Sequence, residues 1–137
     1  MVPLFVVAPE GARADVGRDS QERFVERVDE ARVRAALAVA LMEENAFDAA
    51  LTHLAAARRL TPTWFFAHAV YARARRIRGL DAGPTLEALH LALELRPDSP
   101  MVLRELGMTL ETLGRSRQAH AVWLTLTEAL PRDAQAH

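Results

Sequence analysis

Arginine supplies every basic side chain of this 137-residue chain, because the sequence has 17 basic residues and no lysine. A guanidinium group is a planar fork that can hold a carboxylate through two parallel hydrogen bonds. Arginines are densest between residues 73 and 78. Such a run of arginines could bind an acidic partner. The alternative is a solvated helix face in a protein from a GC-rich bacterial genome.

The sequence contains no candidate residues for catalysis or for metal binding. None of the five histidines has a second histidine four positions away, and no His-Glu-x-x-His motif occurs. The chain has no cysteine, so thiolate ligands and cysteine nucleophiles are excluded. Glycine-rich phosphate loops and nucleophile elbows are also missing. We therefore predict a protein that is not an enzyme and binds no cofactor or metal.

Charge and hydropathy limit the partners and the compartment. A formal net charge of −1 offers no general attraction for nucleic acid. No apolar run approaches the ~20 residues that a membrane-spanning helix needs. Residues 2–8 are apolar, but no positive residue precedes them and Pro3 interrupts them, unlike a typical signal peptide. We expect a cytoplasmic protein, with an exported one as the alternative.

The composition favours helices as the elements that position these side chains. Half of the residues are hydrophobic, but only 6% are aromatic, so alanine, leucine and valine must supply most of the core. Alanine and leucine are strong helix formers, and β-branched runs are few. The composition therefore predicts an all-α protein of one domain.

Internal repetition is the clearest pattern in the chain. Pro62, Pro97 and Pro131 each close an apolar stretch, at spacings of 35 and 34 residues. Two other sets of markers keep nearly the same period. They are Leu37-Ala38, Tyr71-Ala72 and Leu106-Gly107, followed by Ala50, Thr85 and Ala119. The two sets disagree by one residue in the second repeat, which predicts an inserted residue in the turn 79–84.

In this register the chain resembles the tetratricopeptide repeat family over about residues 31–131. Repeat two departs from the family pattern at Arg75 and Thr85, where an apolar and a small residue are usual. The resemblance implies a right-handed α-solenoid of antiparallel helix pairs, with three repeats and about six helices. Repeat three matches best, with Leu103, Leu106-Gly107, Leu110, Ala119, Trp123 and Pro131.

Capping residues refine the expected boundaries. Thr63, Ser99 and Ser116 are predicted N-caps, and Asn45 and Gly114 are predicted left-handed residues at helix ends. Residues 1–18 contain prolines and glycines and are predicted to be extended or disordered. The repeat domain is expected over 19–131, and 132–137 as a short tail. The predicted helices are 20–44, 46–60, 64–78, 84–95, 100–113 and 116–130.

The resemblance also implies a binding surface. In this family the first helix of each repeat lines a concave groove that takes peptides or helices. Residues one repeat length apart should face this groove together. We predict that its arginines bind an acidic side chain or a C-terminal carboxylate, while its apolar residues contact apolar anchors. The predicted groove residues are Arg32, Phe66, Arg73, Arg76, Met101, Arg104 and Met108.

The last helix is a second candidate surface. Solenoids normally need a polar capping element, and too few residues follow Pro131 to form another helix. The alternative is a helix covered by its neighbours, with a few scattered exposed leucines. The predicted docking residues are Val122, Leu124, Leu126, Ala129 and Leu130.

Three functions remain compatible with the sequence. The first is a scaffold or adaptor that binds a partner peptide or helix. The second is a structural subunit that self-associates or joins a larger complex, tethered through the apolar run 4–7 near the N-terminus. The third is a small chaperone for a secreted client, since bacterial secretion chaperones also use three such repeats.

Overall fold

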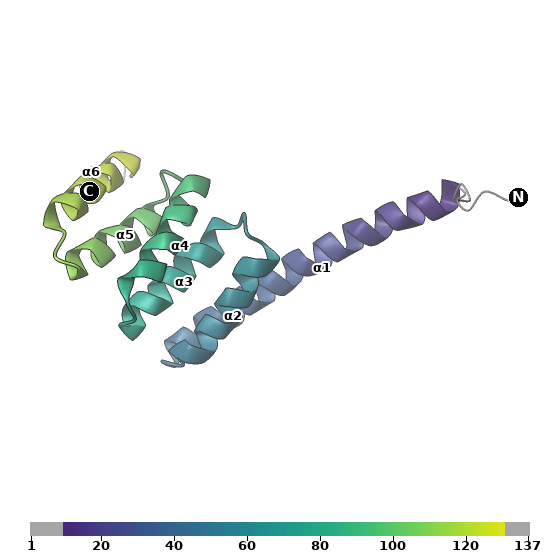
Figure 1. Ribbon diagram of the computed structural model, residues 1–137, viewed down its shortest axis with the longest axis horizontal. Coiled ribbons are helices and arrows are strands. Elements are labelled where there is room, and N and C mark those ends of the chain that lie inside the picture. The colour runs from purple at the N-terminus through teal and green to yellow at the C-terminus, as the bar shows by residue number, and fades with distance from the viewer. Residues whose placement is uncertain (1–9, 131–137) are drawn as a thin grey trace, which may run out of the picture.

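The computed structural model describes residues 10–130, with side chains from Asp19 onward, and every regular element in that range is an α-helix. The helices form three antiparallel pairs that are stacked in chain order (Figure 1). The predicted all-α helical solenoid is confirmed. Its elements are α1 (Glu10–Glu43), α2 (Phe47–Leu60), α3 (Phe65–Arg78), α4 (Ala82–Leu95), α5 (Pro100–Thr112) and α6 (Ser116–Ala129).

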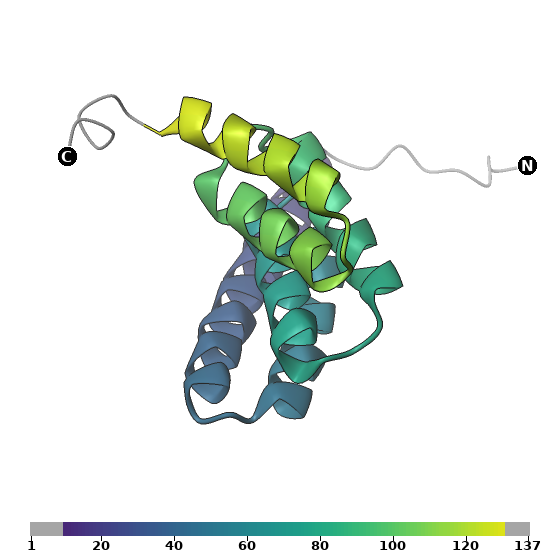
Figure 2. The ribbon, with the colours of Figure 1, turned by 90° about the vertical axis from the view of Figure 1, so that its left-hand side faces the viewer.

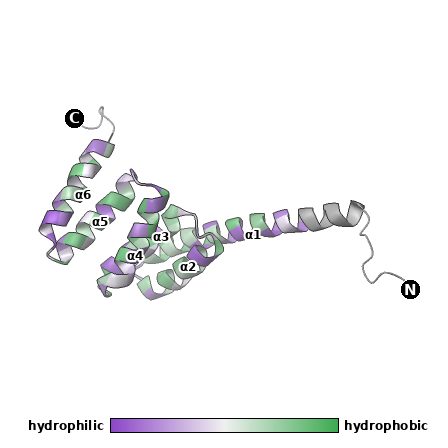
Figure 3. Cartoon of the chain, turned by 45° about the horizontal axis from the view of Figure 1, so that its top comes forward, coloured by the Kyte–Doolittle hydropathy of each residue, from purple (hydrophilic) through white to green (hydrophobic). Residues whose placement is uncertain are grey.

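Each helix packs mainly against the next helix along the chain, and the first helices of successive pairs also contact one another. The end view shows α5 and α6 in front of the other two pairs (Figure 2). Hydrophobic and hydrophilic residues alternate around most helices, so each one turns an apolar stripe toward its neighbours (Figure 3). Stability therefore comes from contacts between adjacent helices, as expected for a repeat architecture.

A left-handed residue ends the first helix of every pair. Asn45, Gly79 and Gly114 have φ angles of 63°, 76° and 75°. The predictions for Asn45 and Gly114 are confirmed. One residue then separates the left-handed residue from α2 and from α6, whereas Leu80 and Asp81 both precede α4. The predicted insertion in the turn 79–84 is therefore confirmed as well.

Arg75 and Thr85, the two residues of repeat two that depart from the family pattern, are hydrogen-bonded to each other. Arg75 Nε donates to Thr85 Oγ1 at 3.2 Å, and Arg75 Nη2 donates to the carbonyl oxygen of Asp81 at 3.1 Å. Thr85 is buried, so its hydroxyl needs such a partner. Arg75 thus satisfies the buried Thr85 hydroxyl and fixes the longer turn through Asp81.

The predicted N-caps are right in one case of three. Ser99 Oγ accepts from the Val102 N–H at 3.4 Å, with Pro100 at the first helical position. Thr63 does not cap α3, because the helix begins one residue later than predicted and Trp64, which has no capping side chain, holds the N-cap position. Ser116 does not cap α6 either, because it already lies inside the helix.

The first helix begins earlier than predicted. Residues 10–18 belong to α1, so the predicted extended segment over 1–18 is wrong for this part. No proline lies between Pro9 and Pro62, and Gly11 and Gly17 each disfavour a helix by only about 1 kcal/mol. The rest of that segment, 1–9, and the predicted tail 132–137 with Pro131 lie outside the described residues. Figure 1 shows that α1 projects well beyond the stack.

The third pair shows why a small residue recurs in each first helix. A Cβ atom built on Gly107 would lie 2.7 Å from Trp123 Cζ2, closer than carbon atoms can approach. The indole is also held by a 2.8 Å hydrogen bond from Trp123 Nε1 to Glu111 Oε1. In the other pairs the corresponding residues are alanine and leucine, namely Ala38 with Leu54 and Ala72 with Leu89.

We predict that Gly107→Ala destabilises the protein by about 1–2 kcal/mol, because overpacking outweighs the better helix propensity of alanine. In a Trp123→Leu background, which restores the alanine–leucine pair of the other repeats, the same change should be neutral or stabilising. Urea unfolding of the four proteins gives this coupling energy. Equal effects of Gly107→Ala in both backgrounds would contradict the close contact.

Candidate functional site

A hollow of about 400 Å³ lies between α1 and α3 and is closed at one end by α5. Phe66, Arg73 and Met101, three of the predicted groove residues, come together here. We call it the α1–α3 hollow, and it occupies part of the predicted groove. It is lined by Val39, Met42, Glu43, Phe47, Phe66, Val70, Arg73, Ile77 and Met101.

The lining of the α1–α3 hollow is mainly apolar, and its floor is well supported. Met42, Phe66 and Met101 pack against the buried cluster that contains Ala38 and Val70. The ring of Phe66 also lies 5.4 Å from the ring of Trp64, centroid to centroid. Such supported aromatic and methionine side chains offer adaptable contacts to an apolar partner group.

Two of the predicted groove arginines, Arg73 and Arg76, lie beside the same buried carboxylate. Arg76 Nε lies 2.9 Å from Glu105 Oε2, and Arg73 Nε lies 3.7 Å from Glu105 Oε1. The Glu105 side chain is only 7% exposed, against 22% for Arg76 and 54% for Arg73. A buried carboxylate requires charged or hydrogen-bonding partners, so Glu105 offsets one of the two positive charges that were predicted to bind a ligand.

The remaining predicted groove residues do not join this hollow. Arg104 is exposed and Met108 is half-buried on α5, and neither lines the α1–α3 hollow. Arg32 lies near the middle of α1 and borders a different hollow. The predicted groove set is therefore divided, because Phe66, Arg73 and Met101 line the α1–α3 hollow and the other four residues do not.

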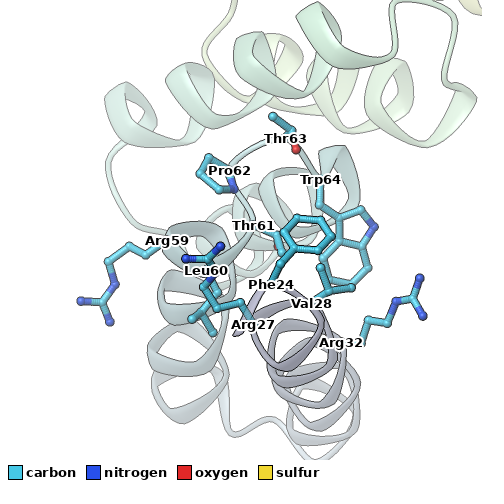
Figure 4. Close-up of a pocket in the computed structure, with 10 residues that line it drawn as sticks. All are labelled: Phe24, Arg27, Val28, Arg32, Arg59, Leu60, Thr61, Pro62, Thr63 and Trp64. Carbon is cyan, nitrogen blue, oxygen red and sulfur yellow. The ribbon is translucent and has the colours of Figure 1, made fainter. Parts of the chain in front are cut away.

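That second hollow, of about 580 Å³, lies where α1 leaves the stack, against the turn between α2 and α3. The rings of Phe24 and Trp64 lie near its centre, with Arg59 and Arg32 on opposite sides (Figure 4). We call it the arginine hollow. It is lined by Phe24, Arg27, Val28, Arg32, Arg59, Leu60, Thr61, Pro62, Thr63 and Trp64.

The wall of the arginine hollow is fixed by a buried histidine. His68 Nδ1 accepts from Arg58 Nε at 2.9 Å, so Nε2 carries the proton and donates to the Pro62 carbonyl oxygen at 2.6 Å. The guanidinium of Arg58 also lies 4.2 Å from the centroid of the Tyr71 ring. These contacts hold the turn between α2 and α3 in place.

The predicted docking surface on α6 is mostly used for packing. Leu126 is only 9% exposed, and the half-buried Val122 packs against the cluster of α3, α4 and α5, so these two side chains contribute mainly to the packing of α6. They face inward because α6 meets α5 along this side. Ala129 and Leu130 are half-buried, and Leu124 alone of the predicted set is well exposed.

Among residues 19–130, no group of three histidine, aspartate or glutamate side chains lies close enough to hold a metal ion. None of the helices in the described range is long and apolar enough to cross a membrane.

Several residues of these sites were not predicted. Glu105 left a detectable signal, because the residue one repeat earlier is the apolar Val70, and an acid in an apolar column requires a charged partner. Ile77 and Phe47 lie at helix ends, where the repeat register says little about direction. Phe24 and Trp64 meet only through the tertiary fold, since about 40 residues separate them.

Comparison with known proteins identifies the fold. No family model and no curated protein sequence matches the chain. Among solved structures, a mutant form of MamA is similar, with a TM-score of 0.67 and 20% sequence identity. The match covers 88% of this chain and 89% of that one. The chain thus has a tetratricopeptide-like helical repeat fold.

We predict that Glu105→Gln lowers the free energy of unfolding by about 1–2 kcal/mol, because a neutral amide replaces a charge-assisted acceptor beside two arginines. The matched control is Glu87→Gln on the exposed side of α4, which should change stability by less than about 0.5 kcal/mol. Urea unfolding measures both variants. Equal stability of the two variants would show that Glu105 does not hold Arg73 and Arg76.

Proposed function

We propose that this protein is a non-enzymatic interaction scaffold that holds an apolar segment of a partner protein, a peptide or a helix, in the α1–α3 hollow. The observation that carries the proposal is the combination of a firm apolar floor with exposed apolar side chains at the rim. Phe66, Met42 and Met101 supply the floor, and Val39 and Ile77 the rim. An amphipathic helix binds to this kind of surface through its apolar face.

Size and charge support the same occupant. A hollow of about 400 Å³ can take a few apolar side chains. Arg73 has Glu105 as a carboxylate neighbour at 3.7 Å and is half exposed to solvent, and Glu43 is the only acid in the lining, so an apolar occupant does not have to replace a charged partner of Arg73. The tetratricopeptide-like fold agrees with the proposal, because solenoids present extended surfaces for other proteins.

Site-specific photocrosslinking tests where the partner lies. Benzoylphenylalanine replaces Ile77 in one protein and Leu91 on α4 in another. The two natural side chains are similarly exposed, at 44% and 39%, so Leu91 is a matched control for random collisions. We expect defined protein adducts in cells from position 77 and few from position 91. Equal adducts from both positions would contradict binding in the α1–α3 hollow.

The affinity for the crosslinked partner should then depend on Ile77 at the rim of the α1–α3 hollow. Ile77→Glu places a charge where apolar contact is expected and should weaken the purified complex by about 10–100-fold, corresponding to roughly 1.5–3 kcal/mol of apolar burial. Leu91→Glu should leave the affinity unchanged. Calorimetry measures both variants, and circular dichroism confirms that both are folded.

A second candidate is a structural subunit that associates through the outer face of α1. Val33, Ala36, Leu37 and Ala40 are all exposed on this face, although their spacing is that of a helix-packing stripe. A stripe of this kind usually buries itself against another helix.

We predict that, if this face joins two copies, the molar mass from light scattering rises with concentration and falls to that of one chain in Val33→Glu/Leu37→Glu. A monomeric wild-type protein at all concentrations would exclude self-association through this face.

A further inference from the structure

The arginine hollow has a different charge from the α1–α3 hollow. Arg27, Arg32 and Arg59 border it, and its lining contains no acidic residue. Within residues 19–130, none of these three arginines forms an ion pair with a carboxylate. The neighbouring acid Glu30 is already paired with Arg34 at 3.0 Å. The lining of the hollow is therefore positively charged.

Its centre is apolar and partly uncovered. Phe24 is 59% exposed although it lies on the same stripe of α1 as the fully buried Ala31. Trp64 is half-buried and packs against the small cluster of Ala31, Ala57 and Ala67. An exposed phenylalanine next to an anchored tryptophan marks a place where another apolar group can be buried.

The hollow is also preorganised. His68 and Arg58 fix the Pro62 carbonyl, and Trp64 is held against Phe66. The turn between α2 and α3 and the Trp64 ring therefore need little further ordering when a ligand binds, which lowers this part of the entropic cost of binding.

We propose that the arginine hollow is a second binding site, which takes an acidic segment of a partner protein carrying one large apolar or aromatic side chain. The apolar side chain enters between Phe24 and Trp64. Flanking carboxylates pair with the guanidinium groups of Arg32 and Arg59, which lie on opposite sides of the rings (Figure 4). This site does not depend on occupation of the α1–α3 hollow, and it binds an acidic segment rather than an apolar one.

The acidic segment fits better than a single-stranded nucleic acid, which also combines negative charge with stacking rings. Exposed acids lie close in sequence to the α1 residues that line the hollow, among them Glu22, Glu26 and Asp29. A continuous phosphate backbone would pass these acids, whereas a short peptide confines its charge to the three arginines.

The test uses three fluorescein-labelled probes and two charge-reversed proteins. The probes are a short peptide of alternating Glu and Phe, the same peptide with Lys for Glu, and a single-stranded oligouridylate. The site variant is Arg27→Glu/Arg32→Glu/Arg59→Glu. The control is Arg104→Glu/Arg115→Glu/Arg117→Glu, which changes the net charge equally at exposed arginines outside the hollow.

Fluorescence anisotropy should show that the wild type and the control bind the acidic peptide, and that the site variant binds it at least about tenfold more weakly, a loss of about 1.4 kcal/mol. The site variant should in turn bind the lysine peptide, a gain that an unfolded protein would not show. Equal loss in both variants, equal binding of both peptides, or preference for the oligonucleotide would overturn the proposal. Ile77→Glu should leave acidic-peptide binding unchanged, so failure of either site is distinguishable from failure of the other.

Discussion

The helices of each pair lie close together because a small residue is buried where they meet: Ala38, Ala72 or Gly107. The opposing side chain, Leu54, Leu89 or Trp123, fills the space that the small residue leaves. In the third pair there is no room even for a Cβ atom. This constraint sets the register of every helix pair, and the register determines which side chains of α1, α3 and α5 remain on the outside. Both hollows are consequences of that arrangement, since they are lined by residues that the close packing leaves uncovered.

The distribution of charge then separates the two hollows. Glu105, buried on α5, lies between Arg73 and Arg76 and offsets one of their two charges, and the rest of the α1–α3 hollow is mainly apolar. Within residues 19–130, no carboxylate forms an ion pair with Arg27, Arg32 or Arg59 at the other site. The long α1 contributes to both, with its middle at one hollow and its last turns at the other. Trp64 and Phe66, whose rings touch, lie one in each lining. A partner with an acidic and an apolar part could therefore engage the protein at two adjoining places.

The periodic features of this fold could be predicted from the sequence, because they arise from local spacing. The helix pairs, the left-handed Asn45 and Gly114, and the insertion before α4 all follow from the repeat register. The site was predicted less well, since charge pairing is a tertiary property. Arg73 was predicted to bind a ligand, but its ion pair with Glu105, on another helix, could not be read from the repeat spacing. The burial of Leu126 was missed for a related reason, because periodicity identifies an apolar position but not the neighbouring helix that covers it.

The most direct test of the account is methyl NMR of the protein labelled with ¹³C at its methionines, titrated with the crosslinked partner. Met42 and Met101 lie in the α1–α3 hollow, and Met108 lies outside it on the same helix as Met101. We predict that the methyl resonances of Met42 and Met101 shift with the partner while that of Met108 stays in place. A shift of Met108 with no change at Met42 and Met101 would contradict binding in the α1–α3 hollow.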